Sequence, residues 1–210
     1  MRRGLLKRAF LWSRNKPEKV SPKKPEKAGG GVIVQGDEVI LREKRIEDGP
    51  DDYAWRTDEE LARLDASRPL NMQYADFLKY SREELAFPGP RSQRFAIDTR
   101  SGKHIGNCMC YDIDLRQGEA ELGIMIGDRE YWGKGYGTDS VKSLLRYVFT
   151  SMTLTRVYLH TLDWNHRARQ SFTKSGFREV KQVRRSGMDF ILMEVLRSDW
   201  ERDQEDGSGR

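Results

Sequence analysis

The stretch Tyr131-Trp132-Gly133-Lys134-Gly135-Tyr136-Gly137-Thr138 decides the fold, because it separates two segments of different periodicity. The apolar run 122–126 before it predicts a strand. Three glycines at alternate positions remove side chains where a ligand could approach the backbone. The residues after it follow the i, i+3, i+4, i+7, i+8 spacing of an amphipathic helix: Val141, Leu144, Leu145, Val148 and Phe149. Since the first turn of a helix offers unpaired N–H groups and a positive dipole end, the stretch predicts a phosphate site.

Two common phosphate motifs do not match this loop. A Walker A loop ends in Gly-Lys-Ser/Thr, but Lys134 is followed by Gly135. A dinucleotide-binding fingerprint requires Gly-x-Gly-x-x-Gly, and here the third glycine falls one position early. The motif alone therefore leaves both phosphate binding and a simple tight turn open.

The charge of the chain is unevenly distributed. At 210 residues, with 37% hydrophobic residues, the chain can form one domain with additions. Residues 1–36 hold ten Lys or Arg and two acidic residues, a net charge of +8, while the whole chain is +5. Residues 37–210 therefore carry −3. A mildly acidic body argues against a general nucleic-acid binder and suits a cationic substrate better.

Both ends of the chain are expected to be tails around a folded body at 37–200. Residues 15–31 are rich in Lys, Pro and Gly, which is typical of a linker. As a helix, the residues before them would be basic and amphipathic, suited to an anionic membrane, a partner such as the ribosome, or a transit-like role. A solvated tail explains the same residues. We expect residues 1–36 to be flexible and 201–210 to be disordered.

The two cysteines, Cys108 and Cys110, fall at i, i+2 in one predicted strand, so they share a face. That spacing is neither a zinc pair nor a Cys-x-x-Cys redox motif. It predicts small buried thiols in a reducing compartment, the cytoplasm. No apolar run reaches the ~20 residues that are needed to span a bilayer.

The remaining elements follow from periodicity and turn residues. Strands are expected near 39–41, 95–97, 104–115, 119–126, 156–161, 178–186 and 189–197. Helices are expected after the capping box 57–60, over 71–85, after the glycine loop and over 165–175. Alternation in the longest strand places on one face Ile105, Met109, Tyr111, Ile113 and Leu115. This order predicts an α+β domain on a mixed sheet.

The order of elements, with a glycine loop after the fourth strand, resembles the GCN5-related N-acetyltransferase (GNAT) superfamily over about residues 38–198. Residues 119–138 are similar to the acyl-CoA pyrophosphate loop of that family. Residues 165–177, Asn-His-Arg-Ala-Arg-Gln-Ser-Phe-Thr-Lys-Ser-Gly-Phe, are similar to its Asn-x-x-Ala … Lys-x-Gly-Phe helix. The sequence Tyr-Trp-Gly-Lys-Gly-Tyr resembles the subgroup of ribosomal-protein alanine and spermidine acetyltransferases.

The resemblance implies a mostly antiparallel sheet flanked by helices, with acyl-CoA held between the splayed strands 4 and 5, at 119–126 and 155–161. It implies binding of the pyrophosphate by the loop residues Trp132, Gly133, Lys134, Gly135, Tyr136, Gly137 and Thr138. Backbone groups of Ile124, Met125 and Ile126 would hold the pantetheine arm, and one N–H would face the thioester oxygen. Asn165 would hydrogen-bond the pantetheine, although its position suits a helix N-cap equally well. Lys134 would add a cation or simply face solvent.

The catalytic groups are less constrained by the sequence. An ammonium must lose a proton before it attacks, so a carboxylate or a water chain is needed. Glu121, on the strand face opposite Leu122, is the first candidate, and Glu119, Asp112 and Asp114 compete with it.

Many members of the family place a tyrosine on the last helix to protonate the leaving thiolate, but here that position is Phe172. Tyr111 or a water is the candidate replacement. His160 is expected to be a packed strand residue and His166 to be exposed. Three histidines without clustered acids predict no metal site.

The resemblance implies transfer of an acetyl group from acetyl-CoA to a primary amine, carried by a protein N-terminus, a polyamine or another small molecule. The alternative is an acyl-CoA-binding module without catalysis, attached to a membrane or the ribosome through its tail. The acceptor pocket is expected within 48–90 and the last strands, where Trp55, Asp51, Asp52 and Asp58 would suit a cation. A homodimer is compatible with this reading.

Overall fold

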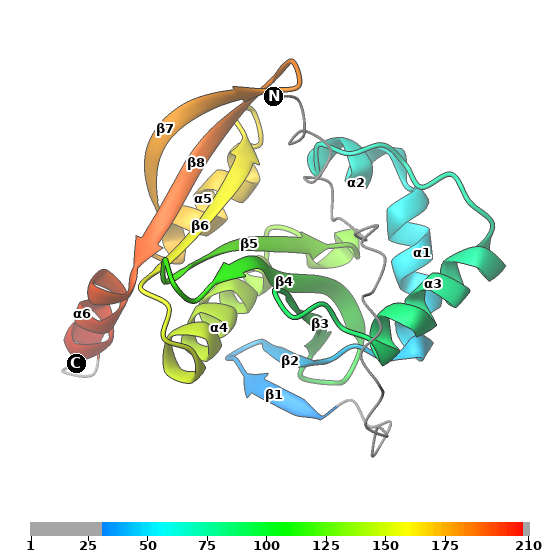
Figure 1. The fold of residues 1–210 in the computed structure, drawn as a ribbon, viewed down its shortest axis with the longest axis horizontal. Coiled ribbons are helices and arrows are strands. Elements are labelled where there is room, and N and C mark those ends of the chain that lie inside the picture. Colours follow the sequence, from blue (N-terminus) through cyan, green and yellow to red (C-terminus); the bar gives the residue numbers. More distant parts are fainter. Residues whose placement is uncertain (1–30, 208–210) are drawn as a thin grey trace.

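The computed structural model describes residues 31–207, which form one mixed sheet flanked by helices (Figure 1). Within these residues the sheet has eight strands in the order β1-β2-β3-β4-β5-β6-β8-β7. All neighbours are antiparallel except β5 and β6, which confirms the predicted α+β class and mostly antiparallel sheet. The strands are β1 Val32–Gln35, β2 Val39–Glu43, β3 Gln93–Thr99, β4 His104–Asp114, β5 Glu119–Ile126, β6 Arg156–Leu162, β7 Arg178–Arg185 and β8 Met188–Leu196.

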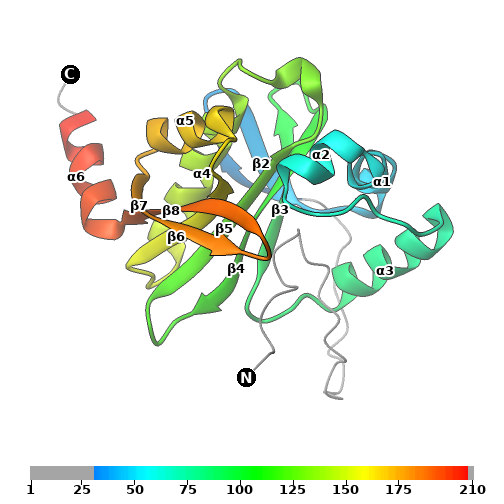
Figure 2. The ribbon, with the colours of Figure 1, turned by 90° about the horizontal axis from the view of Figure 1, so that it is seen from above.

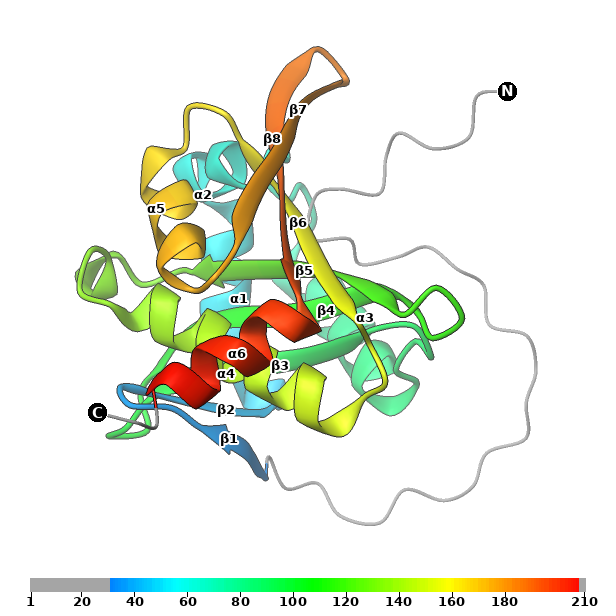
Figure 3. The same cartoon turned by 90° about the vertical axis from the view of Figure 1, so that its left-hand side faces the viewer.

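The helices lie on both sides of this sheet. They are α1 Gly49–Thr57, α2 Glu59–Leu64, α3 Tyr74–Ala86, α4 Tyr136–Ser151, α5 His166–Lys174 and α6 Arg197–Gly207, with short 3-10 turns η1 Ile46–Asp48 and η2 Arg129–Tyr131. Figures 2 and 3 show α4 and α6 on one side of the sheet and α1, α2 and α3 on the other. Of the helices in the described part of the chain, none is both long and apolar enough to cross a membrane.

Helix α4 packs its apolar stripe against one face of the sheet. The five predicted stripe residues are all at most 2% exposed: Val141, Leu144, Leu145, Val148 and Phe149. They form one core with Leu122 of β5 and Leu159 of β6. Burying each such side chain stabilises the fold by roughly 1.5–3 kcal/mol. The free thiols of Cys108 and Cys110 lie in this core, on the shared face that their spacing predicts.

Strand β4 differs from the prediction of one continuous apolar face. Its pairing shifts register at two places, opposite Ile97 in β3 and between Tyr111 and Asp114 against β5. Each bulge reverses which side of the sheet the following residues face. As a result Ile105 and Ile113 join the core beneath α4, whereas Met109 and Tyr111 pair with Gly123 and Glu121 on the opposite face. Leu115, beyond the strand, is 63% exposed.

Three elements were missing from the predicted order. Strand β1 occupies Val32–Gln35, inside the range assigned to the flexible tail, because the turn after it is tied to α4 through Asp139. Helix α6 extends to Gly207, so the tail expected from residue 201 is wrong for 201–207. Its anchor is Trp200, whose ring lies 5.4 Å from that of Phe149. The basic amphipathic segment before residue 31 lies outside the described residues.

Helix α1, the third missing element, begins with Gly49-Pro50, and proline is favoured in a first turn because it has no N–H to satisfy. Buried ion pairs tie it to the sheet. Arg42 of β2 donates to Asp48 at 2.7 Å and to Asp98 at 2.6 Å. Lys44 Nζ lies 2.6 Å from Asp52 of α1. His104 of β4 lies 3.4 Å from both Asp52 and Asp98.

Candidate functional site

Strands β5 and β6 form a fork. They pair only through Glu119 to Glu121 of β5 and Arg156 to Tyr158 of β6, although β5 continues to Ile126 and β6 to Leu162. On its other side β5 stays paired with β4 as far as Ile126. Beyond Glu121, one edge of β5 therefore faces a gap between strands, where an extended ligand can bind like an added strand. The sequence analysis expected this divergence of the two strands.

The glycine loop and the start of α4 lie at the open end of this fork. Gly133 and Gly135 have φ values of +71° and +92°, a conformation that favours glycine, and a Cβ at either position would meet no atom within 4 Å. Helix α4 begins at Tyr136 without a side-chain cap. The first helical bond runs from Asp139 N–H to the Gly135 carbonyl at 2.9 Å, so the N–H groups before it have no helical acceptor.

The loop, β5 and α5 enclose a cavity of about 650 Å³, called here the donor cavity. Apart from Tyr136, all the residues expected to bind the cofactor line it: Ile124, Met125, Ile126, Trp132, Gly133, Lys134, Gly135, Gly137, Thr138 and Asn165. The ring of Tyr136 instead packs against Tyr131 with 4.9 Å between centroids. Its side chain therefore packs with Tyr131 against the hydrophobic core.

Three cations at the donor cavity escaped the sequence analysis: Lys142, Arg167 and Lys174. The guanidinium of Arg167 lies 3.5 Å from the centre of the Trp132 ring, a cation–π contact. The indole N–H of Trp132 in turn donates to the carbonyl of Ile126 at 2.6 Å. With Lys134 these side chains bring four cations to the donor cavity, whose lining also includes the carboxylates of Asp37, Glu38, Asp65 and Asp139. The cations are available to pair with a phosphate-bearing ligand. The sequence did hold a signal for two of them, because Arg167 and Lys174 are seven residues apart and so share one face of the helix that Asn165 caps.

Asn165 caps α5, one of its two expected roles, and lies where the other would require it. Its side-chain oxygen accepts a hydrogen bond from Ala168 N–H at 3.3 Å, which caps α5. The residue also lines the donor cavity and the second cavity described next. Because the oxygen serves the helix, the amide NH₂ is the group left to donate to a ligand.

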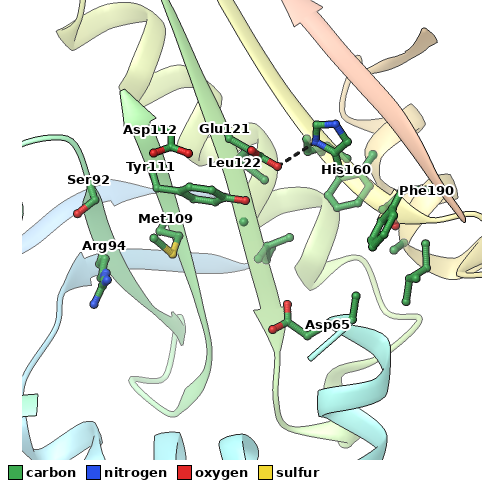
Figure 4. Close-up of a pocket in the computed structure, with 18 of the residues that line it drawn as sticks. Asp65, Ser92, Arg94, Met109, Tyr111, Asp112, Glu121, Leu122, His160 and Phe190 are labelled. Carbon is green, nitrogen blue, oxygen red and sulfur yellow. Dashed lines mark hydrogen bonds and ion pairs between the residues drawn. The ribbon is translucent and has the colours of Figure 1, made fainter. Parts of the chain in front are cut away.

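A second cavity, of about 340 Å³, lies on the opposite face of β5 from α4 and is called here the acceptor cavity (Figure 4). Its apolar wall includes Met109, Leu162 and Phe190, and its polar wall includes Asp65, Asp112, Glu121 and His160. Six residues line both cavities: Leu64, Asp65, Ile124, Asn165, Ala168 and Phe172. The two cavities therefore meet at the fork.

Both residues proposed for catalysis face the acceptor cavity. Glu121 and Tyr111 are direct partners across β5 and β4, so their side chains share one face (Figure 4). Glu121 is only 3% exposed, and its carboxylate accepts a hydrogen bond from His160 Nδ1 at 2.9 Å. His160 is buried, as the sequence predicted, but it lines the acceptor cavity as well.

The three other carboxylates considered as the catalytic base are less well placed than Glu121. Glu119 forms an ion pair with Arg156 at 2.7 Å. Asp114 accepts backbone N–H bonds of 2.9 and 3.1 Å in the turn after β4, which lowers the pKa of its carboxyl. Asp112 lines the acceptor cavity at the β4 bulge, with a φ of +50°. Of the four carboxylates, Glu121 is the buried one that reaches the cavity.

Phe172 stands at the wall between the two cavities. Its ring is 7% exposed and lies 5.9 Å from that of Phe177. It carries no proton to give, so a tyrosine-type acid is ruled out at this position. Tyr111, the direct cross-strand partner of Glu121, brings a hydroxyl group to the acceptor cavity.

The four residues that the sequence suggested for the acceptor pocket do not line the acceptor cavity. Asp52 belongs to the buried ion-pair network, and Trp55 packs against His104 with 5.0 Å between ring centroids. Asp58 caps α2 and binds Arg129 at 2.8 Å. None of these side chains, nor that of Asp51, is among those lining the acceptor cavity. Asp65 and Ala66, at the end of α2, reach it instead.

The described residues contain no group of three or more His, Cys, Asp or Glu side chains placed to hold a metal ion. The polar groups around the fork are backbone amides, the cations of the donor cavity, Asn165, the carboxylates of Asp65 and Asp112, and the Glu121–His160 pair. These groups suit a phosphate-bearing ligand on one side and a proton transfer on the other.

A family model described as "Acetyltransferase (GNAT) domain" matches residues 38–178. Among curated proteins, the chain is 25% identical over 170 residues to an uncharacterized N-acetyltransferase p20 of Bacillus licheniformis, covering 77% of this chain and 94% of the relative. It is 29% identical over 163 residues to human alpha/beta-tubulin-N-acetyltransferase 9, covering 71% and 76%.

Among solved structures, the fold matches spermidine N-acetyltransferase from Vibrio cholerae in complex with CoA and spermine. The TM-score is 0.69 at 20% identity, over 78% of this chain and 98% of the other. At that identity the match concerns the fold. Together with the family model it confirms the resemblance found in the sequence.

Proposed function

Because the chain belongs to the GNAT family of acetyltransferases, we propose that it transfers the acetyl group of acetyl-CoA to a primary amine by direct attack on the thioester. One observation carries this proposal: two cavities of about 650 and 340 Å³ share six lining residues at the β5–β6 fork. A donor and an acceptor bound in them would meet there, and holding two reactants together removes much of the entropic barrier.

The donor cavity has the groups that acetyl-CoA requires. The pyrophosphate is assigned to the N–H groups from Gly133 to Thr138, with Lys134 and Arg167 as nearby cations. The pantetheine arm is assigned to the open edge of β5 at Ile124 to Ile126 and to Asn165. Both glycines with positive φ are open on the ligand side, which supports a close approach of phosphate to the main chain.

The chemistry follows from these positions. A neutral amine attacks the carbonyl carbon of the thioester, the C–N bond forms, and the carbonyl oxygen gains negative charge. An N–H group of β5 beyond Glu121 is assigned to that oxygen, an interaction that contributes several kcal/mol when it is aimed in advance. The C–S bond then breaks, and coenzyme A leaves as a thiolate that takes a proton.

The acceptor is proposed to be an amine on a cationic molecule or on a peptide. The carboxylates of Asp65, Asp112 and Glu121 line its cavity together with Arg91 and Arg94, so acidic side chains exceed basic ones by one. This small excess favours a cationic acceptor. The relatives named above include an enzyme that acts on tubulin and one that acts on spermidine. A protein N-terminus and a polyamine are therefore the first two classes to test.

A second candidate function is acyl-CoA binding without turnover. Phe172 at the usual position of the tyrosine acid favours it, because the leaving thiolate then lacks that proton donor. In this case the chain would be held at a membrane or at the ribosome by its basic N-terminal residues. Turnover with any amine excludes this candidate.

The test is acetyl-CoA binding by calorimetry on the full chain, on Gly135→Glu and on Gly187→Glu. Gly187 is a matched control because it has a φ of +82° and open space around it, but lies in the β7–β8 turn. We expect micromolar binding to the full chain and to Gly187→Glu, and none to Gly135→Glu. A screen of N-terminal peptides, polyamines and aminoglycosides, with free thiol as the readout, then identifies the acceptor. If the full chain does not bind acetyl-CoA, the proposed function is wrong.

A further inference from the structure

Glu121 and His160 form a buried acid–imidazole pair at the point where the fork opens. Glu121 is the last residue of β5 that pairs with β6, where its partner is Tyr158. His160 lies two residues after Tyr158 in β6. Their side chains are each 5% exposed, and Nδ1 of the imidazole lies 2.9 Å from Oε1 of the carboxylate. Both line the acceptor cavity, as Figure 4 shows.

The contact selects one tautomer of the neutral imidazole beside an ionised carboxylate. An ionised carboxylate can only accept a hydrogen bond, so Nδ1 of His160 is the donor. In the neutral ring the lone pair then belongs to Nε2, the nitrogen that can take a proton. A carboxylate behind an imidazole also stabilises the imidazolium once it forms. Glu121 is thus placed to orient and assist His160 rather than to act alone.

We propose that His160 is the catalytic base for the amine and that Glu121 is its positioning residue. This assignment rests on the proposed acetyl transfer. Nε2 of His160 takes one proton from the ammonium, directly or through one water, and releases it to solvent. The neutral amine then forms the C–N bond, and the C–S bond breaks afterwards. The second proton of the nitrogen passes to the coenzyme A thiolate, so the products are an amide and a thiol.

The pair is surrounded by aromatic and apolar side chains on three sides and shares its cavity with four charged groups. Across β4 it faces the Tyr111 phenol, and along β6 the Tyr158 ring, 5.9 Å from that of His160. From β8 it faces the apolar residues Leu192 and Phe190, and from α5 Phe172. The charged groups that share the cavity are Asp65, Asp112, Arg91 and Arg94.

The nearest cation on the strand is already neutralised. Arg156 lies over the Tyr158 ring at 4.7 Å and forms ion pairs of 2.7 Å with both Glu119 and Glu194. Arg94 is paired with Glu84, at the far side of the cavity from β6. A proton taken up by His160 is therefore balanced by Glu121, its direct partner.

A purely structural role is the rival explanation, since the pair also bridges β5 and β6 where their pairing ends. His160→Asn separates the two roles, because its amide can still donate near the Nδ1 position while it has no basic nitrogen. Glu121→Gln keeps the shape of the side chain without the charge. His166→Asn, in the exposed first turn of α5, is the matched control.

The experiment measures kcat/KM for the amine against pH, together with acetyl-CoA affinity and the unfolding midpoint. For His160→Asn we expect a loss of about 10²–10⁴-fold near neutral pH, the usual contribution of a general base, which shrinks at high pH where the amine is already neutral. Glu121→Gln should lower the rate less and shift its acidic limb. His166→Asn should match the parent, and acetyl-CoA affinity should persist in all variants.

Three outcomes would overturn the assignment. A parental pH profile in His160→Asn, with Glu121→Gln inactive, would make the carboxylate itself the base. Lower unfolding midpoints in both variants, with pH profiles unchanged in form, would leave only the structural bridge. Failure of the unmodified chain to bind acetyl-CoA or to turn over any amine would instead contradict the proposed function and not this assignment alone.

Discussion

The indole ring of Trp55 lies directly against the main chain of Gly127, so that a Cβ atom at residue 127 would overlap the ring. Trp55 belongs to α1, and Gly127 follows the last residue of β5. The ring also packs on His104. The contact therefore couples the helices that cover the acceptor side of the sheet to the strand that borders the donor cavity.

Gly127→Ala should lower the free energy of unfolding by about 1–3 kcal/mol, because the added methyl group overpacks this contact. Denaturant unfolding measures it. Trp55→Leu removes the ring, and in that background Gly127→Ala should cost much less. Equal costs in both backgrounds would show that the ring is not what the methyl group meets.

Asp139 ties the turn before β2 to the start of α4. Its carboxylate accepts N–H bonds from Asp37, Glu38 and Val39 at 3.2, 2.7 and 2.9 Å. Asp139→Asn should cost about 1–2 kcal/mol of stability and weaken acetyl-CoA binding, since the helix start is then less well held. Asp76→Asn, an exposed acid in the first turn of α3, is the control. Unchanged affinity in Asp139→Asn would separate the turn from the donor cavity.

The buried ion pair of Arg42 and Asp48 should make the free energy of unfolding depend on pH in the acidic range. Burial alone would raise the pKa of Asp48, but the hydrogen bonds from Arg42 and the charge of Lys44 lower it to about 2 from 3.8. This stabilisation, roughly 2 kcal/mol, is complete above the unfolded value and is lost as pH falls from about 4 to 2. Urea unfolding of the parent and of Asp48→Asn should show a flatter pH dependence in the variant. Parallel curves would contradict the role of the pair.

His104 should act in the opposite direction. Burial alone would lower the pKa of its imidazole, but hydrogen bonds to Asp52 and Asp98 raise it above 6.5. The imidazolium stabilises the fold below the unfolded pKa, and this contribution is lost as pH rises through the folded value. As pH rises above 6.5, the unfolding free energy of the parent should fall more than that of His104→Gln. An NMR titration of the imidazole C–H groups checks the assignment.

Much of the fold could be predicted because it depends on local patterns. The glycine loop, the apolar stripe of α4 and the alternation of β5 are each recorded in consecutive residues, and the structure places them as expected. Helix α1 and strand β1 could not be predicted in this way. They are stabilised by contacts with distant residues, such as Lys44 with Asp52 and Asp139 with Glu38.

The same limit applies to the candidate site. Gly133, Gly135 and Asn165 reveal themselves by residue type and spacing, since each suits one backbone position. The contact between Glu121 and His160 joins residues 39 positions apart, and only the register of β5 on β6 brings them together. The bulge between Tyr111 and Asp114, which places Ile113 on the opposite face from Tyr111, leaves no clear trace in the sequence.

The way the two cavities meet has a consequence for the order of events. Each has its own lining elements, α4 and the glycine loop for the donor and β3, β4 and β8 for the acceptor, and they share only the wall at the fork. If the two ligands bind as proposed, neither blocks the space of the other. We therefore expect steady-state kinetics with no obligatory first substrate, and exchange of coenzyme A while the acceptor stays bound.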